Sequence, residues 1–429
     1  MHTRVAIICE NVSLLSHLDG KNATGSSVYI AELSLYLSRN GFHIDIYNVS
    51  NEISITTTVD WMPGIKIFPL VTDRTATLSP SEKSSHLHIT QLSKKLHSQM
   101  NNTGVKYAVI HAFSWLPAAV ALPVSNEIDV PLVVTFDGLA KTGKDSFGEN
   151  SISTGRIELE ELVAANANQL IVTNIEEKET LVNFYHANQN KITVITGGYN
   201  PEEFKVIDKS LARTILGLRE EENILLYSGQ ITISKGIETI IQALPLLETS
   251  QIKLIVIGGK SSVAENDKTE EIQRLKNMAI KLRVLPKILF AGSKNRNNLK
   301  FYYSAADVFI TMPLNGSFSL APIEAMACGT PVIATDIGSL KNAVAHSKTG
   351  FIVPTSEPPA LAQKIDQVFS DNILMQSFQK NALIRARALF PWERVANMVQ
   401  DLYLKILHPT AKSTPVIPIK RAPKRRVIS

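Results

Sequence analysis

The stretch Gly316-Ser-Phe-Ser-Leu-Ala-Pro-Ile-Glu-Ala-Met-Ala-Cys-Gly-Thr-Pro-Val-Ile-Ala-Thr335 joins a loop of small residues to a short helix and then to an apolar strand. A loop that opens a helix presents unpaired backbone N–H groups at the positive end of the helix dipole, where phosphate or pyrophosphate binds. Glu324 falls in the first turns of this helix, and its carboxylate can accept hydrogen bonds from ribose hydroxyls. An ordinary β-α-β crossing is the alternative, which explains the helix but not the length and composition of the stretch.

This stretch resembles the signature of the retaining GT-B glycosyltransferases of family 4, in the branch of sucrose-phosphate synthase-like and mycothiol-type enzymes. Members read Glu-Pro-Phe-Gly-Leu/Ile, three residues, then Glu-Ala-Met-Ala-Cys-Gly-Thr-Pro-Val. Here the second half is intact, whereas Gly316, Ser317 and Ser319 replace Glu, Pro and Gly in the first half. The resemblance implies an α/β protein in which two Rossmann-like, doubly wound domains face a central cleft. It also implies a nucleotide-sugar site that includes Ser319, Leu320, Ala321 and Glu324.

Length and composition agree with a two-domain globular protein. A chain of 429 residues exceeds one typical core, and 44% hydrophobic with 19% charged residues is typical of a soluble protein. The apolar run that ends at Cys9 is too short for a signal peptide or a membrane span. Cys9 and Cys328 fall in a predicted strand and helix, so we expect buried free thiols and a cytoplasmic protein.

Positive charge is concentrated at the C-terminal end of the chain. Six Lys and Arg residues and no acid lie between Lys412 and the end, so the formal charge of +5 leaves about −1 for the remainder. A broad basic face for nucleic acid is therefore not predicted. Prolines and charge density predict a disordered tail over 409–429, which either makes weak contact with an acidic membrane surface or partner, or only adds solubility.

The first half alternates strands with helices, which predicts a parallel, doubly wound sheet. A strand at Val5–Cys9 leads through a polar loop to a helix over Val28–Gly41 and a strand at His43–Val49. No Gly-x-Gly-x-x-Gly follows the first strand, so a dinucleotide-dependent oxidoreductase is not favoured. Further strands are expected at Ile65–Leu70, Tyr107–Phe113, Pro131–Phe136, Gln169–Thr173 and Ile192–Ile195.

Three places in the first half are similar to family motifs. The loop at Gly25 and Ser26 resembles a Gly-Gly-Gln loop whose amides contact the donor diphosphate, although a simple helix cap is the alternative. His111-Ala-Phe-Ser-Trp115 resembles a substrate-side His-x-x-x-Trp. Val133-Val-Thr-Phe-Asp-Gly-Leu-Ala-Lys141 resembles Val-Val-Thr-Phe-His-Ala-Leu-Gly, with Asp137 in place of histidine. An ionised aspartate accepts hydrogen bonds but repels a nearby diphosphate.

The segment Ile192–Phe204 resembles the family's crossing between domains. Gly197 and Gly198 can take unusual backbone angles there, so the hinge is expected near 197–205. Phe390-Pro-Trp-Glu393 resembles the start of the last helix, which returns to the first domain. The predicted organisation is an acceptor domain at 1–198, a nucleotide-sugar domain at 199–389, a crossing helix at 390–408 and the tail at 409–429.

The second half repeats the alternation and carries the phosphate residues. Its first strand, Ile224–Ser228, leads into Gly-Gln-Ile-Thr-Ile-Ser-Lys-Gly, where family members have Gly-Arg, four residues, then Lys-Gly. Lys235 is expected to contact phosphate; Gln230 replaces the arginine and lacks its charge and bidentate fork. Lys294 falls in the loop that lines the nucleobase pocket, with an exposed turn cation as the alternative. Later strands are expected at Lys253–Gly258, Lys287–Gly292, Val308–Met312, Pro331–Thr335 and Gly350–Pro354.

Two functions remain open from these residues. One is a retaining glycosyltransferase that uses a UDP-, GDP- or ADP-sugar, an unknown acceptor and no cofactor, with Asp137, Gln230 and Lys235 at the reacting end. The other is a catalytically silent GT-B protein that binds nucleotide or glycan, or supports an active paralogue. The substitutions at Asp137, Gln230 and Gly316 favour the second function, while Lys235 and Glu324 favour the first. Metal-ligand spacings are not found in the sequence.

Overall fold

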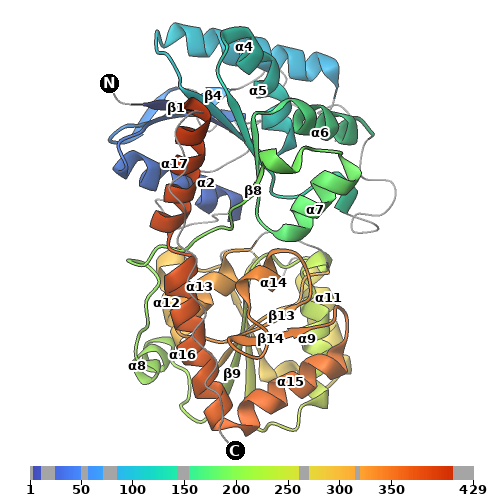
Figure 1. Ribbon diagram of the computed structural model, residues 1–429. Helices are drawn as coiled ribbons and strands as arrows, with labels where there is room; N and C mark the ends of the chain where they lie inside the picture. The colour runs from blue at the N-terminus through green and yellow to red at the C-terminus, as the bar shows by residue number, and fades with distance from the viewer. Residues whose placement is uncertain are drawn as a thin grey trace, which may run out of the picture.

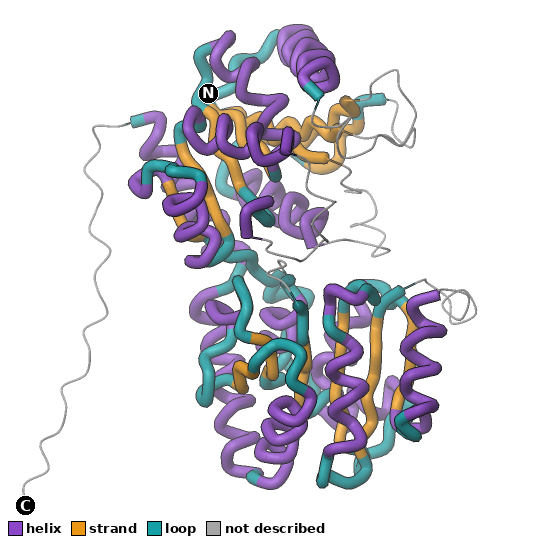
Figure 2. The backbone as a smooth tube through the Cα atoms, turned by 90° about the vertical axis from the view of Figure 1, so that its right-hand side faces the viewer, coloured by secondary structure: helices purple, strands orange, loops and turns teal. Residues whose placement is uncertain are grey.

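The computed structural model describes residues 3–10, 25–49, 57–70, 85–142, 154–259, 270–314 and 319–408. Within these ranges the chain forms two α/β units, one above the other in Figure 1 and in the turned view of Figure 2. The predicted architecture of two Rossmann-like units is therefore confirmed. Gly316, Ser317 and the basic tail at 409–429 lie outside the described residues. Cys9 and Cys328 are buried free thiols, as predicted.

The first unit is built on an eight-stranded sheet with the order β3-β4-β2-β1-β5-β6-β7-β8. Its strands are β1 (Arg4–Glu10), β2 (His43–Val49), β3 (Val59–Met62), β4 (Ile65–Leu70), β5 (Val109–Phe113), β6 (Leu132–Thr135), β7 (Gln169–Val172) and β8 (Ile192–Val194). Alternate residues of β1 enter two different cores, Ala6 and Ile8 on one face and Val5, Ile7 and Cys9 on the other. Both faces of the sheet are therefore covered, which explains why its strands are continuous apolar runs.

Strand β3 departs from the predicted all-parallel sheet. It pairs antiparallel with β4, and the turn between them contains Pro63 and Gly64. Gly64 has a φ of +79°, a conformation that glycine adopts without a steric penalty. The sheet is therefore mixed, with an antiparallel hairpin at its edge.

Helices cover both faces of this sheet. They are α2 (Gly25–Arg39), α4 (His86–Asn102), α5 (Trp115–Ile128), α6 (Thr154–Asn166) and α7 (Ile175–Phe184). Helix α4 packs on α5 and α5 on α6 over one face, while α2 packs over the other together with the last helix of the chain, α17 (Trp392–Leu407).

The second unit is built on a six-stranded parallel sheet with the order β11-β10-β9-β12-β13-β14. The strands are β9 (Asn223–Ser228), β10 (Ile252–Ile257), β11 (Ile288–Gly292), β12 (Val308–Thr311), β13 (Val332–Thr335) and β14 (Gly350–Val353). The helices are α8 (Lys209–Leu216), α9 (Ile237–Ala243), α11 (Glu270–Lys281), α12 (Arg296–Ala305), α13 (Ala321–Ala327), α14 (Ser339–Ala343), α15 (Pro358–Ser370) and α16 (Asn372–Leu389). The strand order reverses beside β9, because β10 lies on one side of it and β12 on the other.

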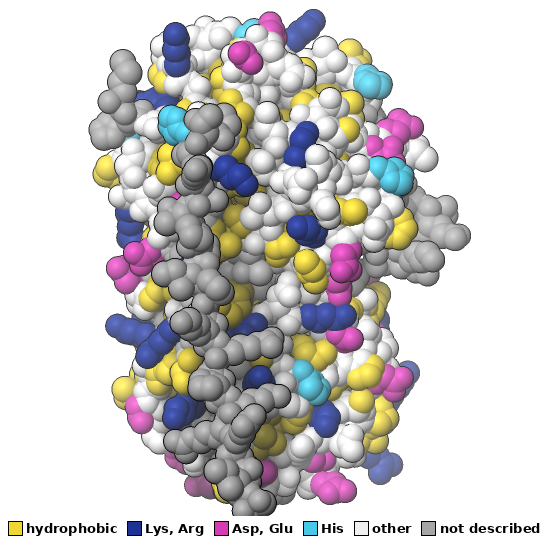
Figure 3. Space-filling model, in the orientation of Figure 1, with side chains coloured by type: hydrophobic (Ala, Val, Ile, Leu, Met, Phe, Trp, Pro, Cys, Tyr) yellow, Lys and Arg dark blue, Asp and Glu magenta, His cyan; other side chains and the backbone are white. Residues whose placement is uncertain are grey.

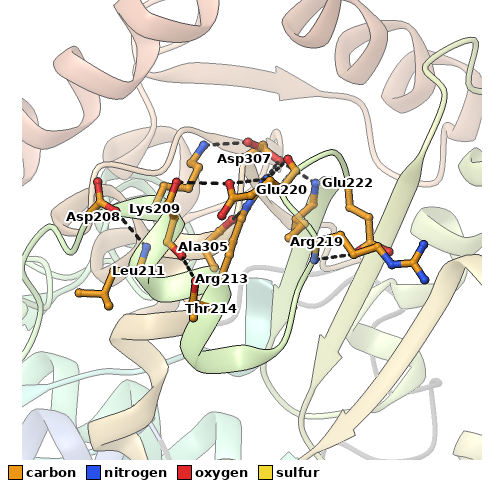
Figure 4. A network of polar contacts seen from close by, with 12 residues as sticks. Asp208, Lys209, Leu211, Arg213, Thr214, Arg219, Glu220, Glu222, Ala305 and Asp307 are labelled. Atoms are coloured by element: carbon orange, nitrogen blue, oxygen red, sulfur yellow. Dashed lines mark hydrogen bonds and ion pairs between the residues drawn. The ribbon is translucent and has the colours of Figure 1, made fainter.

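A partly buried ion-pair network attaches α8 to this sheet, and Figure 4 shows its contacts. Asp307, which precedes β12, accepts hydrogen bonds from Lys209 Nζ at 2.7 Å and Arg213 Nη2 at 2.8 Å. The same carboxylate accepts from the backbone N–H of Ile224 in β9 at 2.7 Å. Because Arg213 is only 4% exposed, this carboxylate compensates a charge that burial would otherwise make costly.

Two crossing segments join the units, and they pair with each other. The N–H of Tyr199 donates to the Phe390 carbonyl at 2.8 Å, and the N–H of Trp392 donates to the Tyr199 carbonyl at 3.1 Å. A Cβ on Gly198 would lie 2.8 Å from the Phe390 oxygen. The close approach of the two segments therefore requires a glycine at this position. The sequence predicted unusual backbone angles at Gly197 and Gly198, but neither residue has a positive φ.

Helix α17 fixes the second crossing to the first unit. Trp392 is fully buried at its start, and its ring meets that of Tyr29 in α2 edge to face at 5.1 Å. Val395, Val399 and Tyr403 continue the same buried face. Burial of each of these larger side chains contributes roughly 2 kcal/mol, so the helix holds the crossing segment firmly against α2.

His111 is a core residue, which corrects its expected place on the substrate side. It is completely buried, and its ring nitrogens lie 2.6 Å from Tyr403 Oη in α17 and 2.7 Å from Thr135 Oγ1 in β6. Burial lowers the pKa of His111 to about 3. The neutral ring therefore joins the central sheet to α17 and does not face the cleft.

The buried His111 makes stability depend on pH. Its folded pKa lies below the ordinary 6.5, so its contribution to stability is present above pH 6.5 and is lost as the pH falls toward 3. Between pH 7 and pH 5 we expect the wild type to lose about 2 kcal/mol more unfolding free energy than His111→Gln. Urea denaturation at both pH values measures this difference. The exposed His86→Gln should behave like the wild type; equal losses in all three proteins would contradict the assignment.

Candidate active site

A cavity of about 440 Å³ lies between the two units, at the carboxyl ends of the second sheet's strands. Its walls come from the start of α2 and from the loops after β9, β10, β11 and β12. This is the place where strand order reverses, and ligands of open α/β sheets bind at such a crevice. The cavity brings together most of the residues that the sequence singled out: Gly25, Ser26, Gln230, Lys235, Lys294, Ser319, Leu320, Ala321 and Glu324.

Positive charge predominates on the walls of this cavity. Among the described lining residues the charged side chains are Lys235, Lys294, Arg296 and Glu324. On the face drawn in Figure 3, by contrast, Lys and Arg side chains are spread over both units among Asp and Glu side chains. Because Arg296 is paired with Glu324 and Glu203, the cations that the cavity offers to an anionic ligand are Lys235 and Lys294.

Lys235 is positioned by a tight turn. It ends the short 3₁₀ turn η3 (Ile233–Lys235), and the next residue, Gly236, has a φ of +68°. A Cβ on Gly236 would lie 1.7 Å from the Met312 carbonyl oxygen, so no other residue fits between this turn and the end of β12. The side chain is half-buried, and burial lowers the pKa of Lys235. Partial desolvation strengthens its attraction for a bound anion.

Gln230 lies on a loop that packs closely on its neighbour. Tyr227 Oη donates to the Gln230 carbonyl at 2.6 Å, which fixes the backbone after β9. A Cβ on Gly258, after β10, would lie 1.9 Å from the Gly229 oxygen. The Gln230 side chain is exposed on the cavity wall and brings an amide where the family motif has a guanidinium.

Glu324 is buried, with 2% of its surface exposed, and two neighbours hold its carboxylate. Tyr303 Oη donates to Glu324 Oε2 at 3.0 Å, and Arg296 Nη1 lies 2.7 Å from Oε1. Arg296 also donates through Nε to Glu203 at 3.1 Å. Burial by itself would lower the pKa of Arg296, but the charges of neighbouring glutamates outweigh it and raise that pKa.

Arg296 and Tyr303 line the cavity but were not predicted as site residues. Arg296 stands two positions after Lys294 and begins α12, the helix that follows β11. A cation so close to the end of a strand could have been predicted to reach the ligand site. Its partners Glu203 and Glu324 lie far along the chain in both directions, and sequence spacing does not reveal them. Tyr303 follows the helical pattern of a core residue, and only its hydroxyl reaches the site.

Asp137 lies beside the cavity but is not part of its wall. Its side chain is exposed, and Ser26 Oγ donates to Asp137 Oδ2 at 3.3 Å. The following loop is anchored by the buried Glu160, which accepts from the Ala140 N–H at 2.9 Å. Arg156, paired with Glu160 at 2.7 Å, donates to the Gly138 carbonyl at 3.1 Å. Asp137 is thus held at the start of α2 by a structured loop.

A second contact joins the units across the cleft. Glu176, in the first turn of α7, accepts from the Gly338 N–H at 2.8 Å and pairs with Lys341 Nζ at 2.8 Å. Lys341 also pairs with Asp336 at 3.0 Å. Hydrogen bonding to both acids, Glu176 and Asp336, raises the pKa of Lys341. In Figure 1 the α7–α14 contact lies to the right of the segment where α17 begins.

No group of three or more His, Cys, Asp or Glu side chains in the described ranges is arranged to hold a metal ion. The helices of those ranges include none that combines the length and apolar composition needed to cross a membrane.

Two family models match the chain in succession. The model described as Glycosyltransferase Family 4 matches residues 23–203, and the model described as Glycosyl transferases group 1 matches residues 208–385. Each match falls on one of the two units, so the same family is indicated by both halves of the chain.

Known proteins resemble the chain over almost its whole length. A D-inositol 3-phosphate glycosyltransferase of Xylanimonas cellulosilytica is 28% identical over 408 residues, which are 93% of this chain and 96% of that protein. Sucrose-phosphate synthase of Thermosynechococcus elongatus superposes with a TM-score of 0.82 at 26% identity, covering 95% of this chain and 100% of that one. Anabaena HepE in complex with UDP and glucose shares the fold, with a TM-score of 0.70 at 17% identity over 94% and 99% of the two chains.

The steric restriction at Gly236, in the turn that carries Lys235, can be tested against a control glycine, Gly217, which ends α8. Gly236 and Gly217 have similar φ angles, +68° and +66°, but a Cβ on Gly217 meets nothing within 4 Å. Gly217→Ala should therefore cost about 1 kcal/mol of unfolding free energy, from backbone strain alone. Gly236→Ala adds a clash with backbone and should cost roughly 3 kcal/mol or more. Chemical denaturation compares them; equal costs would show that the turn tolerates a side chain.

Proposed function

This chain belongs to family 4 of the GT-B glycosyltransferases, and from that premise we propose that it is a retaining hexosyltransferase with a nucleotide-sugar donor. One observation carries the proposal: Lys235, Glu324 and the start of α2 share a single cavity between the two units. In our assignment 1–198 is the acceptor domain, 199–389 the nucleotide-sugar domain and 390–408 the helix that crosses back. The donor thus lies at the edge of the second sheet with its sugar toward the first unit.

The nucleotide is assigned to the walls formed by the second unit. Glu324 accepts hydrogen bonds from the ribose, and the backbone of Ser319, Leu320 and Ala321 lies beside the phosphates. Lys294 is placed at the nucleobase, on the loop after β11. Lys235 binds the diphosphate, where its half-buried ammonium neutralises charge as the sugar–phosphate bond breaks.

The reacting end of the site depends on few side chains. In a retaining transfer the acceptor hydroxyl arrives on the face that the diphosphate leaves, so the diphosphate oxygens take the hydroxyl proton. Lys235, Gln230 and the amides at Gly25 and Ser26 then stabilise the departing diphosphate. Asp137, next to Ser26, is suited to accept hydrogen bonds from sugar hydroxyls but not to approach the diphosphate.

A catalytically silent GT-B protein is the second candidate. It is favoured by specific side chains: Gln230 brings no charge to the diphosphate, and Asp137 brings a negative one near it. Such a protein would keep the nucleotide pocket, because Lys235, Lys294 and Glu324 remain, and would bind a donor without transferring its sugar.

A panel of donors separates the two functions. We expect one of the UDP-, GDP- or ADP-sugars to bind, to be slowly hydrolysed, and to transfer its sugar when an acceptor is present. The acceptor panel should include D-inositol 3-phosphate, because the relatives that match this chain are named for it. Calorimetry measures binding, and NMR of the product measures turnover and whether the anomeric configuration is retained. Binding without turnover of any donor would support the silent protein and overturn the proposed activity.

The phosphate assignment of Lys235 predicts a loss of nucleotide affinity. Lys235→Ala should weaken binding of the best nucleoside diphosphate about tenfold or more, because a partly desolvated charge contact to phosphate is removed. Titration calorimetry measures both dissociation constants. Lys348→Ala, an exposed lysine of the same unit outside the cavity wall, is the control and should bind like the wild type. Unchanged affinity in Lys235→Ala would remove the assignment.

A further inference from the structure

Arg296 lies at the centre of a buried charge cluster that the expected family motifs do not explain. Its guanidinium is 2.7 Å from Glu324 Oε1 and 3.1 Å from Glu203 Oε2, and it stacks over the Phe204 ring at 4.7 Å. Glu203 and Phe204 follow the segment that crosses between the units, whereas Glu324 belongs to α13 in the cavity wall. Arg296 therefore connects the crossing segment to the nucleotide pocket.

Both members of the Arg296–Glu324 pair can form a further hydrogen bond, Arg296 through Nη2 and Glu324 through Oε1. Oε1 is ion-paired with Nη1 at 2.7 Å, and a carboxylate oxygen can accept a further hydrogen bond beside that contact. Arg296 Nη2 is a buried donor without a hydrogen-bond partner in the described ranges. A buried donor without a partner is costly, so a ligand group that accepts from Nη2 would stabilise the pair.

A hydroxyl group satisfies both atoms at once, since it donates one hydrogen bond and accepts another. Both residues line the cavity, and the nucleotide assigned there brings ribose hydroxyls to Glu324. We propose that Arg296 is a specificity-determining residue of the nucleotide pocket. It donates to the ribose hydroxyl that Glu324 Oε1 accepts from, so the pair selects ribonucleotides over deoxyribonucleotides. This inference rests on the proposed nucleotide-sugar function.

Glu203 and Phe204 give the guanidinium a fixed orientation. The Nε–Glu203 bond and the stacked ring hold one edge of the plane, so that the terminal nitrogens are directed toward α13. A lysine at this position would keep the charge but not the planar fork. Discrimination between ribose and deoxyribose therefore depends on the guanidinium, and not on positive charge alone.

The wild-type protein provides the first test. UDP, GDP and ADP are titrated to find the best ligand, which is then compared with its 2′-deoxy and 3′-deoxy forms. We expect at least one deoxy form to bind about tenfold or more weakly, the loss typical of a hydrogen bond to a charged group. Equal affinities of all three forms would overturn the inference while leaving the proposed function intact. Failure of every nucleotide to bind would overturn the proposed function and this inference together.

Variants assign the discrimination to Arg296. In Arg296→Met the deoxy penalty should fall to about threefold or less, whereas Arg274→Met, another ion-paired arginine of the same unit outside the cavity, should keep the wild-type penalty. Because Arg296→Met leaves Glu203 and Glu324 uncompensated, Arg296→Lys serves as the variant that preserves the charge, and its penalty should also fall. A full penalty in Arg296→Lys, or in folded Arg296→Met, would overturn the inference.

Discussion

The pairing of Tyr199 with the 390–392 segment is the constraint on which the arrangement of the two units depends. The chain passes between the units twice, and both passages are held together by backbone hydrogen bonds beside a glycine that leaves no room for a side chain. Helix α17 then secures the second passage by burying Trp392 against α2. The cavity depends on this arrangement of the two units, because its wall combines the start of α2 with the loops of the second sheet.

Much of the fold was predictable because buried parallel strands are continuous apolar runs. The strands at His43–Val49 and Ile65–Leu70 have the predicted bounds, and the other predicted strands differ from the structure by one or two residues at their ends. The β3 hairpin was missed because Val59–Met62 has only four residues and does not form a continuous apolar run, although Pro63-Gly64 is a recognisable turn signal. His111 was misplaced because a polar residue in a strand suggests a ligand contact, while its true partners, Thr135 and Tyr403, become visible only in three dimensions.

The candidate site was predictable where its residues belong to local motifs at strand ends. Lys235 and Gly236 follow β9, and Glu324 lies on the helix after β12, so the shared edge of the sheet brings them together. Arg296 differs, because its significance comes from neighbours supplied by a crossing segment and by another helix. The roles assigned to the site residues, Lys235 and Glu324 included, remain predictions.

The two connections between the units differ in their physical nature. Paired backbone groups and a fully buried tryptophan hold the side of the crossing segments, whereas the contact across the cleft joins Glu176 to Lys341, side chains with 38% and 41% of their surface exposed. Dissolved ions screen attraction between exposed charges and have little effect on buried packing. Rising ionic strength therefore weakens the Glu176–Lys341 ion pair and has little effect on the paired crossing segments. The two edges of the interface between the units thus differ in their sensitivity to salt.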